Sequence, residues 1–199
     1  NGDMTQVKGD SLYPVLNMLN GRYFIMPLQS GQTVPIQNPY TLGNAWIVDE
    51  VKYAKNANEE IDALSELDLR RQAIADEKFR DVLGNSQKQD STSIVKITSY
   101  EPNELHYDVE TAQGGVIVFS EIYYPGWKAT VDGEEVELGR VNYVLRALPV
   151  KAGKHEVVLS FFPTSVDTTE TIAYVGYIVL LLFISFAVYC SRKKKDVKQ

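Results

Sequence analysis

Six side chains that lie close together in the sequence have the chemistry of a sugar-binding or anion-binding site. Three are aromatic and three are polar, and they flank a predicted hairpin: Tyr123, Tyr124, Trp127, Arg140, Asn142 and Arg146. The CH groups of a sugar ring stack on aromatic faces, and an arginine forms paired hydrogen bonds with phosphate or carboxylate. These residues are therefore candidates for binding a glycan or an anionic polymer.

The same residues also fit an ordinary structural role. Aromatic rings dominate many protein cores, and the hairpin register that places Trp127 opposite Leu138 favours a core position. The arginines can pair with the surplus of acidic residues in this chain. A concave face shared by Tyr124, Arg140 and Arg146 would support ligand binding, whereas scattered positions would support a scaffold.

No combination of residues indicates catalysis. The two histidines, His106 and His155, have no second His or Cys nearby at metal-ligand spacing. The sequence contains no nucleophile elbow, P-loop or dinucleotide-binding glycine pattern. The acidic pairs Glu59-Glu60 and Glu134-Glu135, at a helix start and in a hairpin, are interpreted as surface charges. We therefore expect no catalytic residue, no metal and no cofactor.

An apolar stretch near the C-terminus has the length of a transmembrane helix. Residues 171–191 contain no charge, and as a helix they would span about 31 Å, close to the roughly 30 Å hydrocarbon core of a bilayer. Tyr174, Tyr177 and Tyr189 lie near the ends of this stretch, where tyrosine favours the headgroup level. The alternative, a buried helix of a soluble protein, normally shows a polar stripe. We predict that residues 171–191 cross a membrane.

The charges beside this helix predict its orientation. Residues 192–199 form a basic tail, which the positive-inside rule places in the cytoplasm. The bulk of the chain is then extracytoplasmic, on the outer side of the cytoplasmic membrane. The chain has 20 Lys and Arg against 26 Asp and Glu, and five of the basic residues lie in the tail. The outer part is therefore acidic, which argues against nucleic acid as a partner.

The first residues do not explain how the chain reaches the outer side. They read NGDMTQVKGD and contain no apolar core of a signal peptide. We infer that upstream transmembrane helices of the same protein precede this chain, with a cleaved signal peptide as the alternative. The single cysteine, Cys190, allows no intrachain disulfide, so the outer part depends on its hydrophobic core.

Residues 1–90 have the pattern of a mixed α+β region, and Asn58 is the expected N-cap of its second helix. The polar stretch 84–93 predicts a linker, and we place a domain boundary at residue 90. The elements expected in this region are helices over 12–19 and 59–67, strands over 22–28, 45–53 and 73–75, and a loop over 30–44.

Residues 91–165 have the pattern of an antiparallel β-sandwich, with short strands separated by turn signals. Four successive apolar residues, Val116 to Phe119, predict a central strand that is covered on both faces. The Asp132-Gly133 turn predicts a hairpin that pairs Ala129 with Val136. The strands expected outside this hairpin cover 94–100, 104–111, 115–123, 142–149 and 155–162.

The predicted fold class is therefore an α+β N-terminal region followed by an all-β antiparallel sandwich and then one C-terminal transmembrane helix. In residue numbers, the α+β region covers 1–90, the sandwich 91–165, the membrane helix 171–191 and the cytoplasmic basic tail 192–199.

Several segments resemble the C-terminal region of bacterial YfhO-like membrane proteins. The combination of YYPGWKA, DG and AGKH carries the resemblance, and the versions found in Bacteroides-type bacteria are the most similar. The segments are LNGRYFI (Leu19 to Ile25), NPYTLGNAW (Asn38 to Trp46), FSEIYYPGWKATVDG (Phe119 to Gly133), RVNYVLRALPVKAGKHEV (Arg140 to Val157) and Pro163.

The resemblance implies a polytopic membrane protein of the GT-C glycosyltransferase type that uses a lipid-linked sugar donor. It also implies a catalytic carboxylate in an early extracytoplasmic loop, which has no counterpart among these residues. We therefore expect a non-catalytic accessory or acceptor-binding domain whose ligand is a cell-envelope glycan or glycolipid. The alternative is a structural or protein-interaction scaffold that binds no sugar.

Overall fold

The computed structural model describes residues 13–28, 31–84 and 92–196. The chain divides into two compact units, Asn1–Phe161 and Phe162–Gln199. The expected linker over 84–93 and the boundary at residue 90 lie almost wholly outside the described residues.

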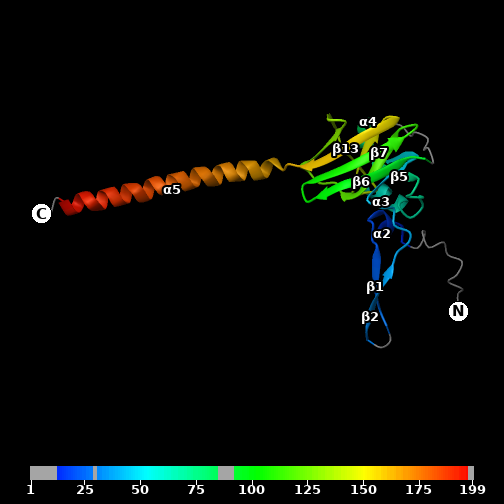
Figure 1. The fold of residues 1–199 in the computed structure, drawn as a ribbon, viewed down its shortest axis with the longest axis horizontal. Coiled ribbons are helices and arrows are strands. Elements are labelled where there is room, and N and C mark those ends of the chain that lie inside the picture. The colour runs from blue at the N-terminus through cyan, green and yellow to red at the C-terminus, as the bar shows by residue number, and fades with distance from the viewer. Residues whose placement is uncertain (1–12, 29–30, 85–91, 197–199) are drawn as a thin grey trace. The chain divides into compact units, whose positions relative to one another are not determined.

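Two antiparallel sheets form the sandwich of the first unit (Figure 1). One sheet has five strands in the order β10-β9-β13-β7-β6, and the other has four in the order β11-β12-β8-β3. The strand bounds of the first sheet are β6 (Ile94–Glu101), β7 (Glu104–Thr111), β9 (Trp127–Val131), β10 (Glu134–Val136) and β13 (Gly153–Phe161). Those of the second are β3 (Ala45–Val48), β8 (Gly115–Ile122), β11 (Gly139–Val141) and β12 (Leu145–Val150).

The core between the two sheets consists of alternate residues from facing strands. Phe119 on β8 meets Tyr107 on β7 edge to face, with ring centroids 5.0 Å apart. Both rings are fully buried, as are Ile117 and Leu159. Aromatic pairs in this geometry add to the free energy gained by burying their area.

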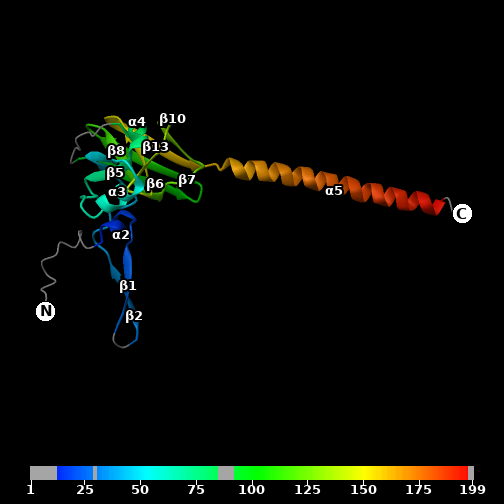
Figure 2. The ribbon, with the colours of Figure 1, turned by 180° about the vertical axis from the view of Figure 1, so that it is seen from behind.

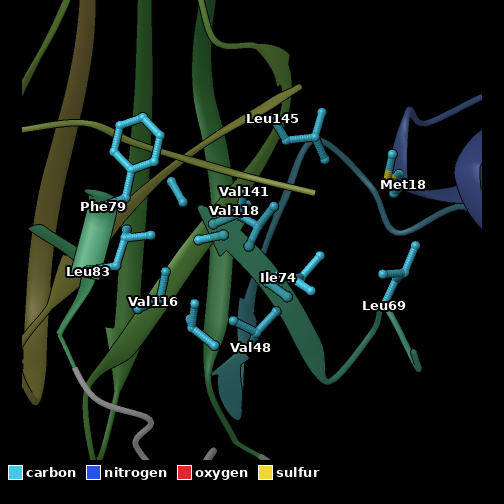
Figure 3. Packing of buried hydrophobic residues seen from close by; sticks show 14 of the residues in the cluster. Met18, Val48, Leu69, Ile74, Phe79, Leu83, Val116, Val118, Val141 and Leu145 are labelled. Carbon is cyan, nitrogen blue, oxygen red and sulfur yellow. The ribbon is translucent and has the colours of Figure 1, made fainter. Parts of the chain in front are cut away.

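A third layer covers the outer face of the four-stranded sheet. It contains the parallel pair β4 (Glu50–Ala54) and β5 (Gln72–Asp76), and four short helices: α2 (Pro14–Met18), α3 (Ala57–Ala63), η1 (Glu77–Phe79) and α4 (Arg80–Leu83). Figure 3 shows the second core formed there, with Phe79 and Leu83 from the helices near Val116 and Val118 from β8. Strand β8 is therefore covered on both faces and has β12 and β3 as neighbours, which confirms the prediction of a central strand.

The hairpin at Asp132-Gly133 has the predicted register, with Val136 paired to Ala129. Both turn residues have positive φ, 54° and 83°, as two-residue hairpin turns require. The Asp132 carboxylate accepts the backbone N–H of Glu156 at 2.9 Å and lies 2.7 Å from Nδ1 of His155. These contacts hold the turn against strand β13, and the His155 hydrogen bond lowers the pKa of Asp132.

Three expected elements differ from the structure. The strand over 45–53 is divided at Asp49 into β3 and β4, because β3 joins the sandwich while β4 pairs with β5. The expected loop over 30–44 contains strand β2 (Thr33–Gln37), which pairs with β1 (Tyr23–Pro27). The strand over 142–149 begins only at Leu145, because Asn142 and Tyr143 have positive φ and form a turn.

The N-cap of α3 is Asn56 and not the expected Asn58. The Asn56 side chain accepts the N–H of Glu59 at 3.0 Å, and the Glu59 carboxylate accepts the N–H of Lys55 at 3.1 Å. This reciprocal arrangement satisfies donors at the start of the helix and fixes where it begins.

The second unit is one helix, α5 (Thr164–Asp196), seen along its length in Figure 2. Its segment Thr168–Ala187 has 20 residues with a mean hydropathy of 1.9, and all of them are exposed. A helix of this length and composition is sufficient to cross a bilayer. It overlaps most of the expected span over 171–191.

We expect Phe119→Ala to lower the free energy of unfolding by about 3–5 kcal/mol, because it opens a cavity between the sheets and removes the ring contact with Tyr107. Phe162→Ala is the matched control, since Phe162 is 63% exposed and its loss should cost within about 0.5 kcal/mol. Denaturant unfolding of the full chain in detergent, followed by far-ultraviolet circular dichroism, measures both. Equal midpoints for the two variants would contradict this core assignment.

Candidate functional site

The structure distributes the six sequence-predicted residues over four places. Arg140 and Asn142 contact the third layer, and Arg146 lies between the sheets with Trp127 beside it. Tyr124 is 61% exposed, and its ring centroid is 6.3 Å from that of Phe161. The sixth residue, Tyr123, is half-buried and packs against both cores. The six residues do not form one concave face.

Arg140 and Asn142 belong to a polar cluster, the Glu60 clamp, which comprises Glu60, Arg140, Asn142 and Tyr143. Arg140 NH2 donates to Glu60 Oε2 at 2.6 Å, and the Tyr143 N–H donates to Glu60 Oε1 at 2.8 Å. The backbone of Asn142 donates to the carbonyl of Ile74 at 2.6 Å, and its side-chain oxygen accepts the Ile74 N–H at 3.0 Å. The clamp therefore joins the β11–β12 turn to α3 and β5.

Glu60 is not the surface charge that its position in the sequence suggests. Its side chain is fully buried, and this burial raises the pKa of the Glu60 carboxyl, opposed by the Tyr143 hydrogen bond and by the charge of Arg140. A buried carboxylate needs such partners to remain ionised. Glu60 is thus a structural residue that couples two layers.

Arg146 is buried at the end of the sandwich, although arginine rarely is. Its NH2 group lies 3.2 Å from Glu121 Oε2, and its guanidinium carbon is 4.0 Å from the ring centroid of Trp127. Nε and NH1 have no hydrogen-bond partner in the described part of the chain. Burial lowers the pKa of Arg146, while Glu121 opposes that shift.

Two tyrosines complete the surroundings of Glu121 and Arg146. The Tyr100 hydroxyl donates to Glu121 Oε1 at 2.9 Å, and this hydrogen bond raises the pKa of Tyr100. The Tyr107 hydroxyl is buried without a hydrogen-bond partner among the described residues, and burial raises its pKa. Both oxygens of the Glu121 carboxylate are therefore held, one by Tyr100 and one by Arg146.

Glu121 lies at the edge of an open hollow of about 450 Å³, the Glu121 hollow. Its lining residues are mostly polar: Leu19, Asn20, Asn44, Tyr100, Ser120, Glu121 and Ile122. Asn44 Oδ1 accepts hydrogen bonds from Arg22 at 3.0 Å and from Asn20 at 3.3 Å. Asn20 Oδ1 is buried and has no partner among the described residues. The volume falls within the range of small-molecule sites.

Contacts of Ser120 with three backbone carbonyl groups position this hollow. The Ser120 hydroxyl contacts the carbonyl oxygens of Met18 at 2.9 Å and Gly43 at 2.5 Å, and the Ser120 N–H donates to the carbonyl of Asn44 at 2.9 Å. One residue of β8 thereby joins the end of α2 to the chain before β3. The position of Asn44 beside Glu121 follows from these bonds.

Sequence reasoning did not select the residues of the Glu121 hollow. A signal was present, because three of the segments that carry the family resemblance meet there: Leu19 to Ile25, Asn38 to Trp46, and Phe119 to Gly133. They are separated in the sequence, and only the pairing of β3 with β8 brings two of them side by side.

A second open hollow of about 300 Å³ is a weaker candidate. Its lining includes Glu66, Asp68 and Arg70, together with residues of α2 and the chain before β3. The Asp68 carboxylate already accepts the N–H of Arg70 at 3.1 Å. Among the described residues, no buried polar atom without a partner lines this hollow, whereas Asn20 lines the Glu121 hollow.

Comparison with known proteins identifies one family. The family model described as "Bacterial membrane protein YfhO" matches residues 63–173, which is more than half of the chain. Neither a curated protein nor a solved structure matches this chain. The matched range runs from the end of α3 into α5 and includes every strand of the sandwich except β3.

We expect Glu60→Ala to lower the free energy of unfolding by about 3–5 kcal/mol, because it leaves the Arg140 charge and the Tyr143 N–H without their partner. Glu135→Ala is the control, since Glu135 pairs with Lys128 while both are more than half exposed, and its loss should cost about 1 kcal/mol or less. Chemical denaturation of the full chain measures the difference. A Glu60→Ala variant as stable as the control would contradict the structural role of the clamp.

Proposed function

This chain belongs to the YfhO family of bacterial membrane proteins, and we propose that it is a non-catalytic, membrane-anchored accessory domain that binds a hydroxyl-rich ligand in the Glu121 hollow. The ligand class is the sugar portion of a cell-envelope glycan or glycolipid. The GT-C resemblance suggests that the domain presents an acceptor to a lipid-linked sugar transferase.

The observation that carries this proposal is the arrangement of Glu121. Its carboxylate is held by Tyr100 and Arg146 at the edge of a hollow that Asn20 and Asn44 also line. Carboxylate and amide oxygens accept hydrogen bonds and amide N–H groups donate them, so the hollow contains both kinds of partner for sugar hydroxyls. The Tyr100 side chain is 59% exposed, so its ring is available for stacking.

The proposed location is the outer side of the cytoplasmic membrane. The basic residues of the 192–199 tail support a cytoplasmic C-terminus, and one membrane span between the tail and the sandwich would then leave the sandwich on the outer side. Within this arrangement the sandwich meets envelope components and has upstream helices of the same protein as partners.

The second candidate function is a scaffold that binds no sugar. Arg140, Asn142 and Arg146, three of the six residues selected from the sequence, all make internal contacts in the structure. Such contacts strengthen the attachment of the layers without providing a ligand surface. The binding experiment below separates this function from the first.

We expect Tyr100→Phe to weaken glycan binding threefold to tenfold, because it removes a hydroxyl that contacts Glu121 and lines the hollow, and one hydrogen bond is worth about 1 kcal/mol. Tyr124→Phe is the matched control, since Tyr124 is an exposed tyrosine outside the hollow. Calorimetric titration of the full chain in nanodiscs against cell-envelope glycans and glycolipid headgroups measures both variants. Absence of saturable binding by the folded wild-type chain would contradict ligand binding and favour the scaffold.

The proposed orientation predicts that a cysteine in place of Lys128, which is 60% exposed, reacts with a membrane-impermeant maleimide in intact spheroplasts. A cysteine in place of Lys198 in the basic tail should react only after the membrane is permeabilised. Both are introduced into the full-length protein with Cys190→Ser. The reverse pattern of labelling would place the sandwich in the cytoplasm.

A further inference from the structure

Strands β1 and β2 form a two-stranded hairpin whose apolar side chains are exposed. They pair with each other and with no further strand in the described part of the chain. Ile25 is 74% exposed and Tyr23 63%. Isolated two-stranded hairpins are at best marginally stable in water, so this one needs a surface to cover it.

The cross-strand register places only apolar side chains on one face of the two strands. Phe24 pairs with Ile36 and Met26 with Val34, so their side chains share a face with that of Leu28. The Phe24 ring also contacts Tyr13 just before α2, with centroids 5.4 Å apart. This contact extends the apolar surface to further exposed residues around α2: Tyr13, Val15, Leu16 and Leu19. A hairpin in water normally exposes one polar face.

The hairpin lies in a long uncharged segment. Between Arg22 and Asp49 the sequence contains no Asp, Glu, Lys, Arg or His, although 23% of the whole chain is charged. A surface for an acidic or basic partner would carry complementary charges. The uncharged segment instead indicates a covering surface that is itself apolar.

Proline blocks the open edges of the hairpin. The Leu28 N–H bonds to the carbonyl of Gln32, and the Asn38 N–H bonds to that of Arg22. The alternation of an antiparallel ladder then turns the backbone of residues 23, 25 and 27, and of 33, 35 and 37, outward. Pro27 and Pro35 occupy one such position on each edge, where an added strand would need an N–H donor. Strand addition by a second copy is therefore disfavoured.

We propose that this hairpin lies in the headgroup region of the bilayer, with its apolar side chains reaching the boundary of the acyl chains. The chain belongs to a membrane-protein family, and only Phe162 and Pro163 separate β13 from the helix that carries the candidate membrane span. Tyrosine is enriched at this depth, which suits Tyr13 and Tyr23. The remaining open backbone groups need water or headgroups, so the hairpin stays out of the hydrocarbon core.

The test uses the full chain with Cys190→Ser in liposomes and an environment-sensitive fluorophore on Ile25→Cys or, on the other face, Ile36→Cys. Ile94→Cys on β6, at an exposed position of the sandwich, is the matched control. We expect lipids spin-labelled near the headgroup to quench at least one hairpin site at least twofold more strongly than the control. Lipids spin-labelled deep in the acyl chain should quench the hairpin sites less.

Other results would overturn the proposal. Quenching of both hairpin sites by aqueous iodide, as at the control, would show a hairpin in water. Protection of both sites from iodide and from both spin-labelled lipids would show that protein covers the hairpin. Stronger quenching by the deep label would show insertion into the core. Because the Glu121 hollow is not altered, this test is independent of glycan binding.

Discussion

Strand β8 has to be covered on both of its faces, and this requirement organises the first unit. Residues 115–119 are all buried, one face against the five-stranded sheet and the other against the helices and the β4–β5 pair. A strand with alternating polarity needs only one cover, whereas this one needs two. Apolar packing is not directional, so it does not by itself fix the position of the outer layer on the sheet. The hydrogen bonds of the Glu60 clamp are directional and fix that position. The hollow beside Ser120 is a product of the same strand, because β8 positions Ser120 and Glu121 directly after its buried residues.

The sequence predicted those features that depend on local chemistry. The Asp132-Gly133 turn is confirmed because both residues tolerate positive φ and because the two arms alternate consistently. The division of the strand over 45–53 was not predicted, since a lone Asp without Gly or Pro is a weak turn signal and the change of sheet depends on distant partners: the N–H of Asp49 bonds to the carbonyl of Arg71. Strand β2 was missed because Pro35 argues against a strand until its pairing with β1 is known.

The candidate site, like the fold, could be predicted only in part from the sequence. Arg146 alternates along β12 with Leu145 and Ala147. Because both faces of this strand are buried, the alternation does not show whether Arg146 reaches solvent. An acidic residue at a helix start, such as Glu60, is already explained by its favourable interaction with the helix dipole, so the sequence gives no reason to expect it to be buried. Its burial becomes visible only through Arg140, 80 residues later in the chain. Residue types indicated planar polar chemistry, and tertiary pairing decided which of those residues are exposed and which contact another layer.

The two tryptophans of the chain are distributed so that each layer contact contains one. Trp46 on β3 packs with the outer core and donates its indole N–H to the carbonyl of Leu69 at 3.0 Å, whereas Trp127 packs with the inner core below the Arg146 guanidinium. A neighbouring cation and a hydrogen-bonded indole shift emission differently. Each of the two interfaces in this chain thus contains its own indole, and loss of the outer layer of this chain before the sandwich opens can be followed by fluorescence without any added label.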